Sequence, residues 1–149
     1  MSKKYYIAYG SNLSVEQMAY RCPEAKIAGM AAIQDWKLVF RTHATIEPCV
    51  GRVVPVLIWE ISQRDEKSLD RYEGWPSYYR KENMTVTMTD LDGKNPKEIT
   101  AMVYLMEDGH DLMPPWRGYY DVLAEGYTRF EFNPYQLELA LKEAEEGLR

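Results

Sequence analysis

Apolar residues recur along the chain with the spacing of both strands and helices. An aromatic run at positions 5–9 predicts a first strand, and alternating apolar residues predict two more at 79–89 and 98–106. Asp92-Gly93 between the latter two is a turn pair, so these strands are expected to form a hairpin. Further strands are predicted at 26–32, 36–41 and 53–60, the last containing Pro55, which indicates a sheet edge or a bulge.

Capping residues predict four helices between these strands. Ser14 followed by Gln17 has capping-box spacing and opens a helix that ends near position 22. Ser62 caps a second helix, over 62–72, which Gly74 closes and which carries Glu73 at its C-terminal end. The third helix opens at Pro114-Pro115 and ends at Gly126, and it has an apolar stripe of Trp116, Tyr119, Tyr120 and Leu123. The fourth helix is amphipathic, starts at Asn133-Pro134 and runs to about Leu148.

This order of elements lacks the regular strand–helix alternation of a parallel doubly wound sheet, so it predicts an α+β protein. Strands outnumber helices and only Pro55 marks an edge, which favours a curled or closed sheet with peripheral helices. The 149 residues have the size of one globular domain, and we expect a single domain over 1–149.

Composition narrows the function classes. The net charge of −5, with no cluster of Lys or Arg, disfavours nucleic-acid binding. The longest stretch without a charged residue, 5–15, is far shorter than a membrane-spanning helix needs, and residues 5–9 are too short and too aromatic for the core of a signal peptide. We therefore expect a cytoplasmic protein, in which Cys22 and Cys49 are buried free thiols.

The turn Gly10-Ser11-Asn12-Leu13 is the first candidate site. It joins a strand to a helix, so its backbone N–H groups converge beside a positive helix end and can bind an anion. Its single glycine matches neither a dinucleotide-binding fingerprint nor a phosphate-binding loop. The alternative interpretation is an ordinary turn in which Asn12 accepts an unusual backbone angle.

Glu73 is the second candidate. A carboxylate at a helix C-terminus faces the negative end of the helix dipole, which should raise its pKa and make it a better general base near neutral pH. The alternative is an exposed Glu at a frayed helix end.

Other chemistry finds no support in the residues. With only two histidines, His43 and His110, no metal site is expected. The chain also lacks the Gly-x-Ser-x-Gly motif that carries the nucleophile of many serine hydrolases, and no cofactor is indicated.

Several segments in their order and spacing resemble the γ-glutamylcyclotransferase-like family (AIG2-like). The resemblance rests on the N-terminal segment 6–13, Tyr-Ile-Ala-Tyr-Gly-Ser-Asn-Leu, and on the segment 69–74, Leu-Asp-Arg-Tyr-Glu-Gly. It continues through Tyr79, the segment 101–106, and Pro115-x-x-x-Tyr119 with Gly126 seven residues later, and so covers nearly the whole chain.

The resemblance implies a small mixed β-barrel with flanking helices and a cavity where the loop of Tyr9 to Leu13 meets Glu73. It implies an amide-cleaving, cyclising enzyme that releases 5-oxoproline and a free amine or amino acid from a γ-glutamyl small molecule, without a cofactor. Glu73 would be the general acid/base; the substrate-binding residues would be Tyr9, Gly10, Ser11, Asn12, Leu13, Tyr79 and Tyr119. For each tyrosine, plain core packing is the alternative role.

Two other functions stay open at this point. One is a non-catalytic ligand-binding or regulatory module that keeps the same cavity. The other is a biosynthetic enzyme that removes a γ-glutamyl protecting group by the same chemistry. The leaving amine and the oligomeric state are not given by the sequence.

Overall fold

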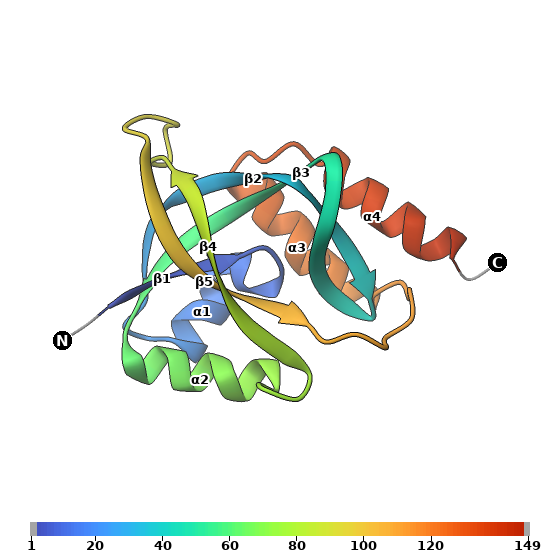
Figure 1. Cartoon of the computed structure of the whole chain (residues 1–149), viewed down its shortest axis with the longest axis horizontal. Coiled ribbons are helices and arrows are strands. Elements are labelled where there is room, and N and C mark those ends of the chain that lie inside the picture. The colour runs from blue at the N-terminus through green and yellow to red at the C-terminus, as the bar shows by residue number, and fades with distance from the viewer. Residues whose placement is uncertain (1–2, 148–149) are drawn as a thin grey trace.

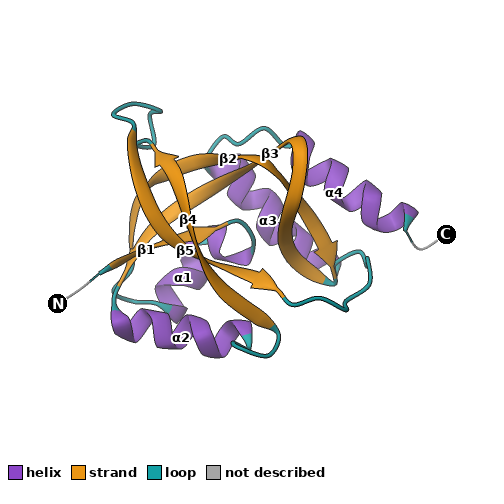
Figure 2. Cartoon of the chain, in the orientation of Figure 1, coloured by secondary structure: helices purple, strands orange, loops and turns teal. Residues whose placement is uncertain are grey.

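Strands and helices alternate irregularly through residues 3–147, the part of the chain that this computed structural model describes (Figures 1 and 2). The strands are β1 (Lys4–Ala8), β2 (Lys26–Arg41), β3 (His43–Ile61), β4 (Tyr79–Met88) and β5 (Lys97–Met106). The helices are the short 3-10 turn η1 (Ser11–Leu13), α1 (Val15–Arg21), α2 (Gln63–Glu73), α3 (Arg117–Arg129) and α4 (Tyr135–Glu146).

The strands form one mixed sheet in the order β2-β3-β1-β5-β4, in which β1 runs parallel to β5 and the other neighbours are antiparallel. The sheet curls until its edges touch at one point, where the backbones of Met30 and Thr89 exchange hydrogen bonds of 3.0 and 2.9 Å. A Cβ on neighbouring Gly29 would lie 2.2 Å from the Thr89 carbonyl oxygen, so glycine permits this approach. The expected α+β fold is confirmed, but the curled sheet is not closed by a continuous ladder.

Two of the predicted strands are one continuous strand. The segments 26–32 and 36–41 join through a bulge at Asp35, which has a φ of 64° and shifts the register between Gln34 and Trp36. The Asp35 carboxylate accepts a hydrogen bond of 2.9 Å from the backbone N–H of Gly51 across the ladder. The interval between the two predicted strands is therefore a bulge within one strand, held by the partner strand.

The strand predicted at 53–60 begins ten residues earlier, at His43. It lies between β2 and β1, so β3 as a whole is not an edge. However, the pairing with β1 ends at Ala8 opposite Leu57, so Pro55 lies where β3 has a partner strand only on the β2 side. The local edge that proline requires is present within an otherwise central strand.

The helices follow their capping residues with two corrections. α3 starts at Arg117, leaving Trp116 79% exposed rather than on the apolar stripe, and it continues past Gly126 to Arg129. The Ser14 hydroxyl caps α1 through the Gln17 N–H, but the Gln17 side chain bonds to Arg21 and does not complete a capping box. α2 has its full Ser62–Asp65 capping box and its left-handed Gly74.

The hairpin and the last helix agree with the sequence pattern. β4 and β5 pair in register from Tyr79 opposite Met106 to Met88 opposite Lys97. The Asn133 side chain accepts a hydrogen bond of 3.0 Å from the N–H of Tyr135 at the start of α4. The predicted end of this helix at Leu148 lies outside the described residues.

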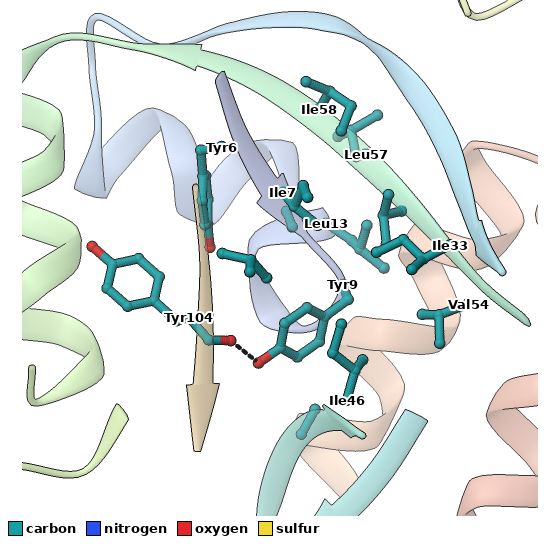
Figure 3. Close-up of a cluster of buried hydrophobic side chains, with 14 of the residues drawn as sticks. Tyr6, Ile7, Tyr9, Leu13, Ile33, Ile46, Val54, Leu57, Ile58 and Tyr104 are labelled. Carbon is teal, nitrogen blue, oxygen red and sulfur yellow. Dashed lines mark hydrogen bonds between the residues drawn. The ribbon is translucent and has the colours of Figure 1, made fainter. Parts of the chain in front are cut away.

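The hydrophobic core includes side chains on both faces of the central strands, since consecutive residues such as Leu57 and Ile58 of β3 are both fully buried (Figure 3). Cys22 and Cys49 are both free, but only Cys22 is buried, while Cys49 is partly exposed. Between residues 3 and 147, none of the helices combines the length and the apolar character that crossing a membrane demands.

Candidate active site

The loop that follows β1 presents backbone N–H groups at the end of the central strand. Within η1 the Leu13 N–H donates to the Gly10 carbonyl at 3.0 Å, which leaves the N–H groups of Ser11 and Asn12 without a backbone acceptor in the described chain. The side chains of Ser11 and Asn12 are buried, with 7% and 3% of their surface exposed. Of the loop amides considered from the sequence, those of Ser11 and Asn12 are therefore without a backbone partner in the described chain, whereas the amide of Leu13 is used inside the turn.

Leu13 supports the loop through packing. Its side chain is fully buried against α3, and a Cβ on Gly126 would lie 2.6 Å from the Leu13 Cβ. Gly126 is thus not a helix end but the point at which α3 makes room for the loop.

We expect Gly126→Ala to lower the free energy of unfolding by about 1–2 kcal/mol. The new methyl group overlaps Leu13, and the cost of this overlap exceeds the gain in helix propensity. Gly118→Ala in the same helix is the matched control, since nothing lies within 4 Å of its Cβ position, and it should be neutral or stabilising. Urea unfolding of both variants measures the difference. Equal stabilities for the two variants would contradict the packing role.

Glu73 is brought to this loop by the last turn of α2. Asp70, one turn earlier, accepts a hydrogen bond of 2.7 Å from the Tyr104 hydroxyl of β5 and pairs with Lys81 of β4 at 3.0 Å. Gly74 then leaves the helix with a φ of 67° and donates back to the carbonyls of the last turn. These contacts fix the helix end against the sheet, so Glu73 is half-buried rather than frayed.

Glu73, Tyr79 and Tyr119 are common to two adjoining cavities. A small inner cavity of about 20 Å³ is lined by the loop and a group of tyrosines, and a larger outer cleft of about 260 Å³ adjoins it at these three residues. The inner cavity is lined by Tyr6, Tyr9, Gly10, Ser11, Asn12, Ala44, Glu73, Tyr79, Tyr104 and Tyr119. Leu13 is the one predicted substrate-binding residue that does not line either cavity.

The tyrosine hydroxyls are anchored in different ways. Tyr9 donates to the Tyr104 carbonyl at 2.6 Å (Figure 3), and Tyr79 donates to the Ala44 carbonyl at 2.7 Å. Tyr119 instead accepts from the Ala44 N–H at 3.1 Å, so its own proton stays available to a ligand. Its hydroxyl also lies 3.4 Å from the position that a Cβ on Gly10 would occupy, so the glycine keeps the loop close to Tyr119.

Burial raises the pKa of Glu73 to about 7, and the nearby positive charge of Arg21 opposes part of that rise. The cause is therefore mainly loss of water, whereas the sequence argument invoked the helix dipole. Burial also raises the pKa of Tyr6, Tyr9, Tyr79 and Tyr119, and the charge of Glu73 adds to the rise at each. A carboxyl group with a pKa near neutrality, surrounded by neutral hydroxyls, is suited to accept and return a proton.

Arg21 is a site residue that sequence reasoning missed. Its guanidinium donates to the Asn12 side-chain oxygen at 2.5 Å and to Gln17 at 3.0 Å, and it lies 3.5 Å from the centre of the Tyr72 ring. The Tyr72 hydroxyl is in turn 2.8 Å from the Ser11 hydroxyl. These contacts join the loop to the residue next to Glu73, and no local pattern in the sequence indicates them.

The raised pKa of Glu73 makes a prediction for stability. The native pKa of about 7 lies above the value of 4.5 expected in the unfolded chain. The free energy of unfolding therefore falls as the pH rises from about 4.5 to about 7, and the contribution of Glu73 is constant above that range. Glu73→Gln should therefore be about 3 kcal/mol more stable than the unchanged protein at pH 8 and nearly equal to it at pH 4.5. Urea unfolding at the two pH values tests this, and a gap that does not change with pH would contradict the burial argument.

The remaining features do not compete with this site. A cavity of about 550 Å³ between α3 and the start of α1 contains neither Glu73 nor any of the tyrosines above. Among residues 3–147, no three side chains of His, Cys, Asp or Glu are grouped so that they could hold a metal ion.

Comparison with known proteins gives consistent matches. The model of a family described as gamma-glutamyl cyclotransferase, AIG2-like, matches residues 6–128. The gamma-glutamylcyclotransferase of Mus musculus is 33% identical over 133 residues, which cover 81% of this chain and 68% of the mouse protein; that of Bos taurus is 33% identical over 135 residues, with the same coverage of both chains. A solved structure of a gamma-glutamyl cyclotransferase, 28% identical, superposes with a TM-score of 0.74 over 93% of this chain and 86% of that one.

Proposed function

This chain belongs to the AIG2-like gamma-glutamyl cyclotransferase family, and from that membership and the geometry of its site we propose that it cleaves γ-glutamyl compounds to 5-oxoproline and a free amine or amino acid. The observation that carries the proposal is the meeting of the half-buried carboxyl group of Glu73, whose pKa is raised to about 7, with the N–H groups of Ser11 and Asn12, which have no backbone acceptor among the described residues. A proton carrier and an anion site beside one cavity are what an intramolecular amide cyclisation requires.

The reaction needs no nucleophile from the protein. The α-amine of the glutamyl group attacks its own γ-carbonyl carbon, a five-membered ring closes, and the bond from that carbon to the leaving nitrogen breaks. The protein must fold the flexible glutamyl chain into the geometry of attack. Binding of the substrate's α-carboxylate, or of the oxyanion that develops on the γ-carbonyl, achieves this. We assign this to the N–H groups of the loop of Gly10, Ser11 and Asn12, with Leu13 packing beneath them.

Proton transfer falls to Glu73. Over the whole reaction the α-nitrogen changes from an ammonium to a lactam N–H and loses two protons, while the leaving nitrogen changes from an amide N–H to an ammonium and gains two. A carboxyl group with a pKa near the working pH can carry these protons in turn. Tyr119, whose proton is not donated within the described chain, can donate a hydrogen bond to the substrate, and Tyr9 and Tyr79 form the walls.

The proposal is tested by incubating the purified protein with γ-glutamyl amino acids, γ-glutamyl amines and glutathione and measuring 5-oxoproline and the released amine by mass spectrometry. We expect the two products in equal amounts from at least one substrate class. Tight calorimetric binding of a γ-glutamyl compound that is recovered intact would instead favour a non-catalytic binding module. The absence of both turnover and binding would reject the proposed site.

A further inference from the structure

The outer cleft beyond Glu73 has aromatic walls. The inner cavity of about 20 Å³ has room for about one water molecule, so only the end of a glutamyl group can reach the loop there. The rest of the substrate that the proposed function requires, with its leaving group, must lie in this cleft of about 260 Å³. The aromatic residues that line it are His43, Tyr72, Tyr78, Tyr79 and Tyr119. Flat apolar faces on several sides favour a leaving group that has a flat apolar part of its own.

Tyr78 is a preformed wall of this cleft. Its backbone is fixed at both ends, since its N–H donates to the Gly74 carbonyl at 2.8 Å and its carbonyl accepts from the Glu107 N–H at 2.9 Å. Its ring lies 4.6 Å from the His110 ring and 5.3 Å from the Tyr79 ring, measured between centroids. A ring held in this way costs little entropy when a ligand packs against it.

His43 contributes a flat and uncharged surface. Its ring lies edge-on to Tyr119, with centroids 5.4 Å apart, and edge-on to Tyr78, at 6.1 Å. Burial lowers the pKa of His43, so the imidazole is neutral at pH 7. The charged residues of the cleft are therefore Glu73 at its base and Arg71.

Arg71 is a cation without an anionic partner among the described residues. It is exposed, and its guanidinium has a 3.5 Å contact to the Ser68 hydroxyl but forms no ion pair within residues 3–147. Arg21, by contrast, already donates to two side chains of the protein. A guanidinium at the mouth of a cleft favours a carboxylate on the bound molecule and disfavours a second positive charge.

From these features we propose that the outer cleft is a subsite for an amino acid leaving group with an aromatic side chain. The ring packs against Tyr78 and His43, and the α-carboxylate pairs with Arg71. This inference rests on the proposed function, and it disfavours γ-glutamyl polyamines, whose free end would bring a positive charge towards Arg71.

Three substrates separate the two contacts: γ-glutamylphenylalanine, γ-glutamylalanine, which lacks the ring, and γ-glutamylphenethylamine, which lacks the carboxylate. We expect kcat/KM for the first to exceed that for each of the others by about three- to tenfold. Arg71→Gln should remove the advantage over the phenethylamine compound, and Tyr78→Leu the advantage over the alanine compound. Arg64→Gln, which removes the same charge from the far end of α2, is the matched control and should change none of the three rates.

The outcomes distinguish this inference from the function on which it rests. γ-Glutamylalanine turned over as fast as the phenylalanine compound would overturn the aromatic subsite while supporting the cyclotransferase activity. An equal loss on all three substrates in Arg71→Gln would overturn the carboxylate contact. The rate of Tyr78→Leu on γ-glutamylalanine reports whether that variant is folded. If none of the three yields 5-oxoproline but another γ-glutamyl compound does, only the subsite is wrong; if no γ-glutamyl compound does, the proposed function fails with it.

Discussion

Glu73→Gln is expected to lower kcat for 5-oxoproline release by about 10²–10⁴-fold, the usual contribution of a positioned general acid/base. The amide keeps the shape of the side chain but can neither accept the ammonium proton nor return it to the leaving nitrogen. In the unchanged protein, kcat/KM should rise with pH through about 7, where the buried carboxyl ionises, and Glu73→Gln should lose this limb of the profile. Rates measured across pH 5–9 by mass spectrometry test both effects.

Two controls connect the loss to the chemistry of the side chain. Glu138→Gln removes a carboxylate from an exposed position of α4 and should leave the rate unchanged. Calorimetric binding of a γ-glutamyl compound by Glu73→Gln should persist, which would separate a lost proton carrier from a lost pocket. Turnover within threefold of the unchanged protein would show that Glu73 is not the acid/base.

The parts of this fold that the sequence predicts are those determined by neighbouring residues. The capping box of Ser62 and Asp65, the left-handed Gly74 and the β4–β5 hairpin depend on contacts within a few positions or across one turn. They also suffice to place Glu73 at the C-terminal end of a helix. The family resemblance then joined that helix end to the loop after β1, which is a pairing that local patterns do not contain.

The errors have a common physical origin in contacts between distant segments. Asp35 resembles a chain break until its bond to Gly51 on the partner strand is known. Gly126 resembles a helix end, but the residue that requires a glycine there is Leu13, which lies far away along the chain. The pKa of Glu73 follows the same rule, because the burial that raises it comes from tyrosines on other elements.

Arg21→Met is expected to lower kcat/KM by about 10–100-fold without removing any group that we place on the reacting atoms. Methionine keeps much of the aliphatic stem but loses the donors to Asn12 and Gln17 and the charge beside the Tyr72 ring. The loop and the end of α2 then lose a shared support, and a displacement of about 1 Å in an active site can cost about 10²-fold in rate. Single-turnover and steady-state rates on the best substrate measure the loss.

The pH profile shows whether Arg21 acts as more than a structural support. Because its positive charge lowers the pKa of Glu73, its removal should move the rising limb of kcat/KM to higher pH. Arg21→Lys keeps the charge but not the planar guanidinium that reaches both acceptors, so it should restore the position of the limb and only part of the rate. Arg129→Met, which removes an exposed arginine from the end of α3, should change neither. If Arg21→Met lowers the melting temperature but leaves the rising limb of kcat/KM in place, Arg21 supports the fold without tuning the base. If the limb shifts in Arg21→Met and returns in Arg21→Lys, one side chain both positions the loop and sets the proton affinity of Glu73.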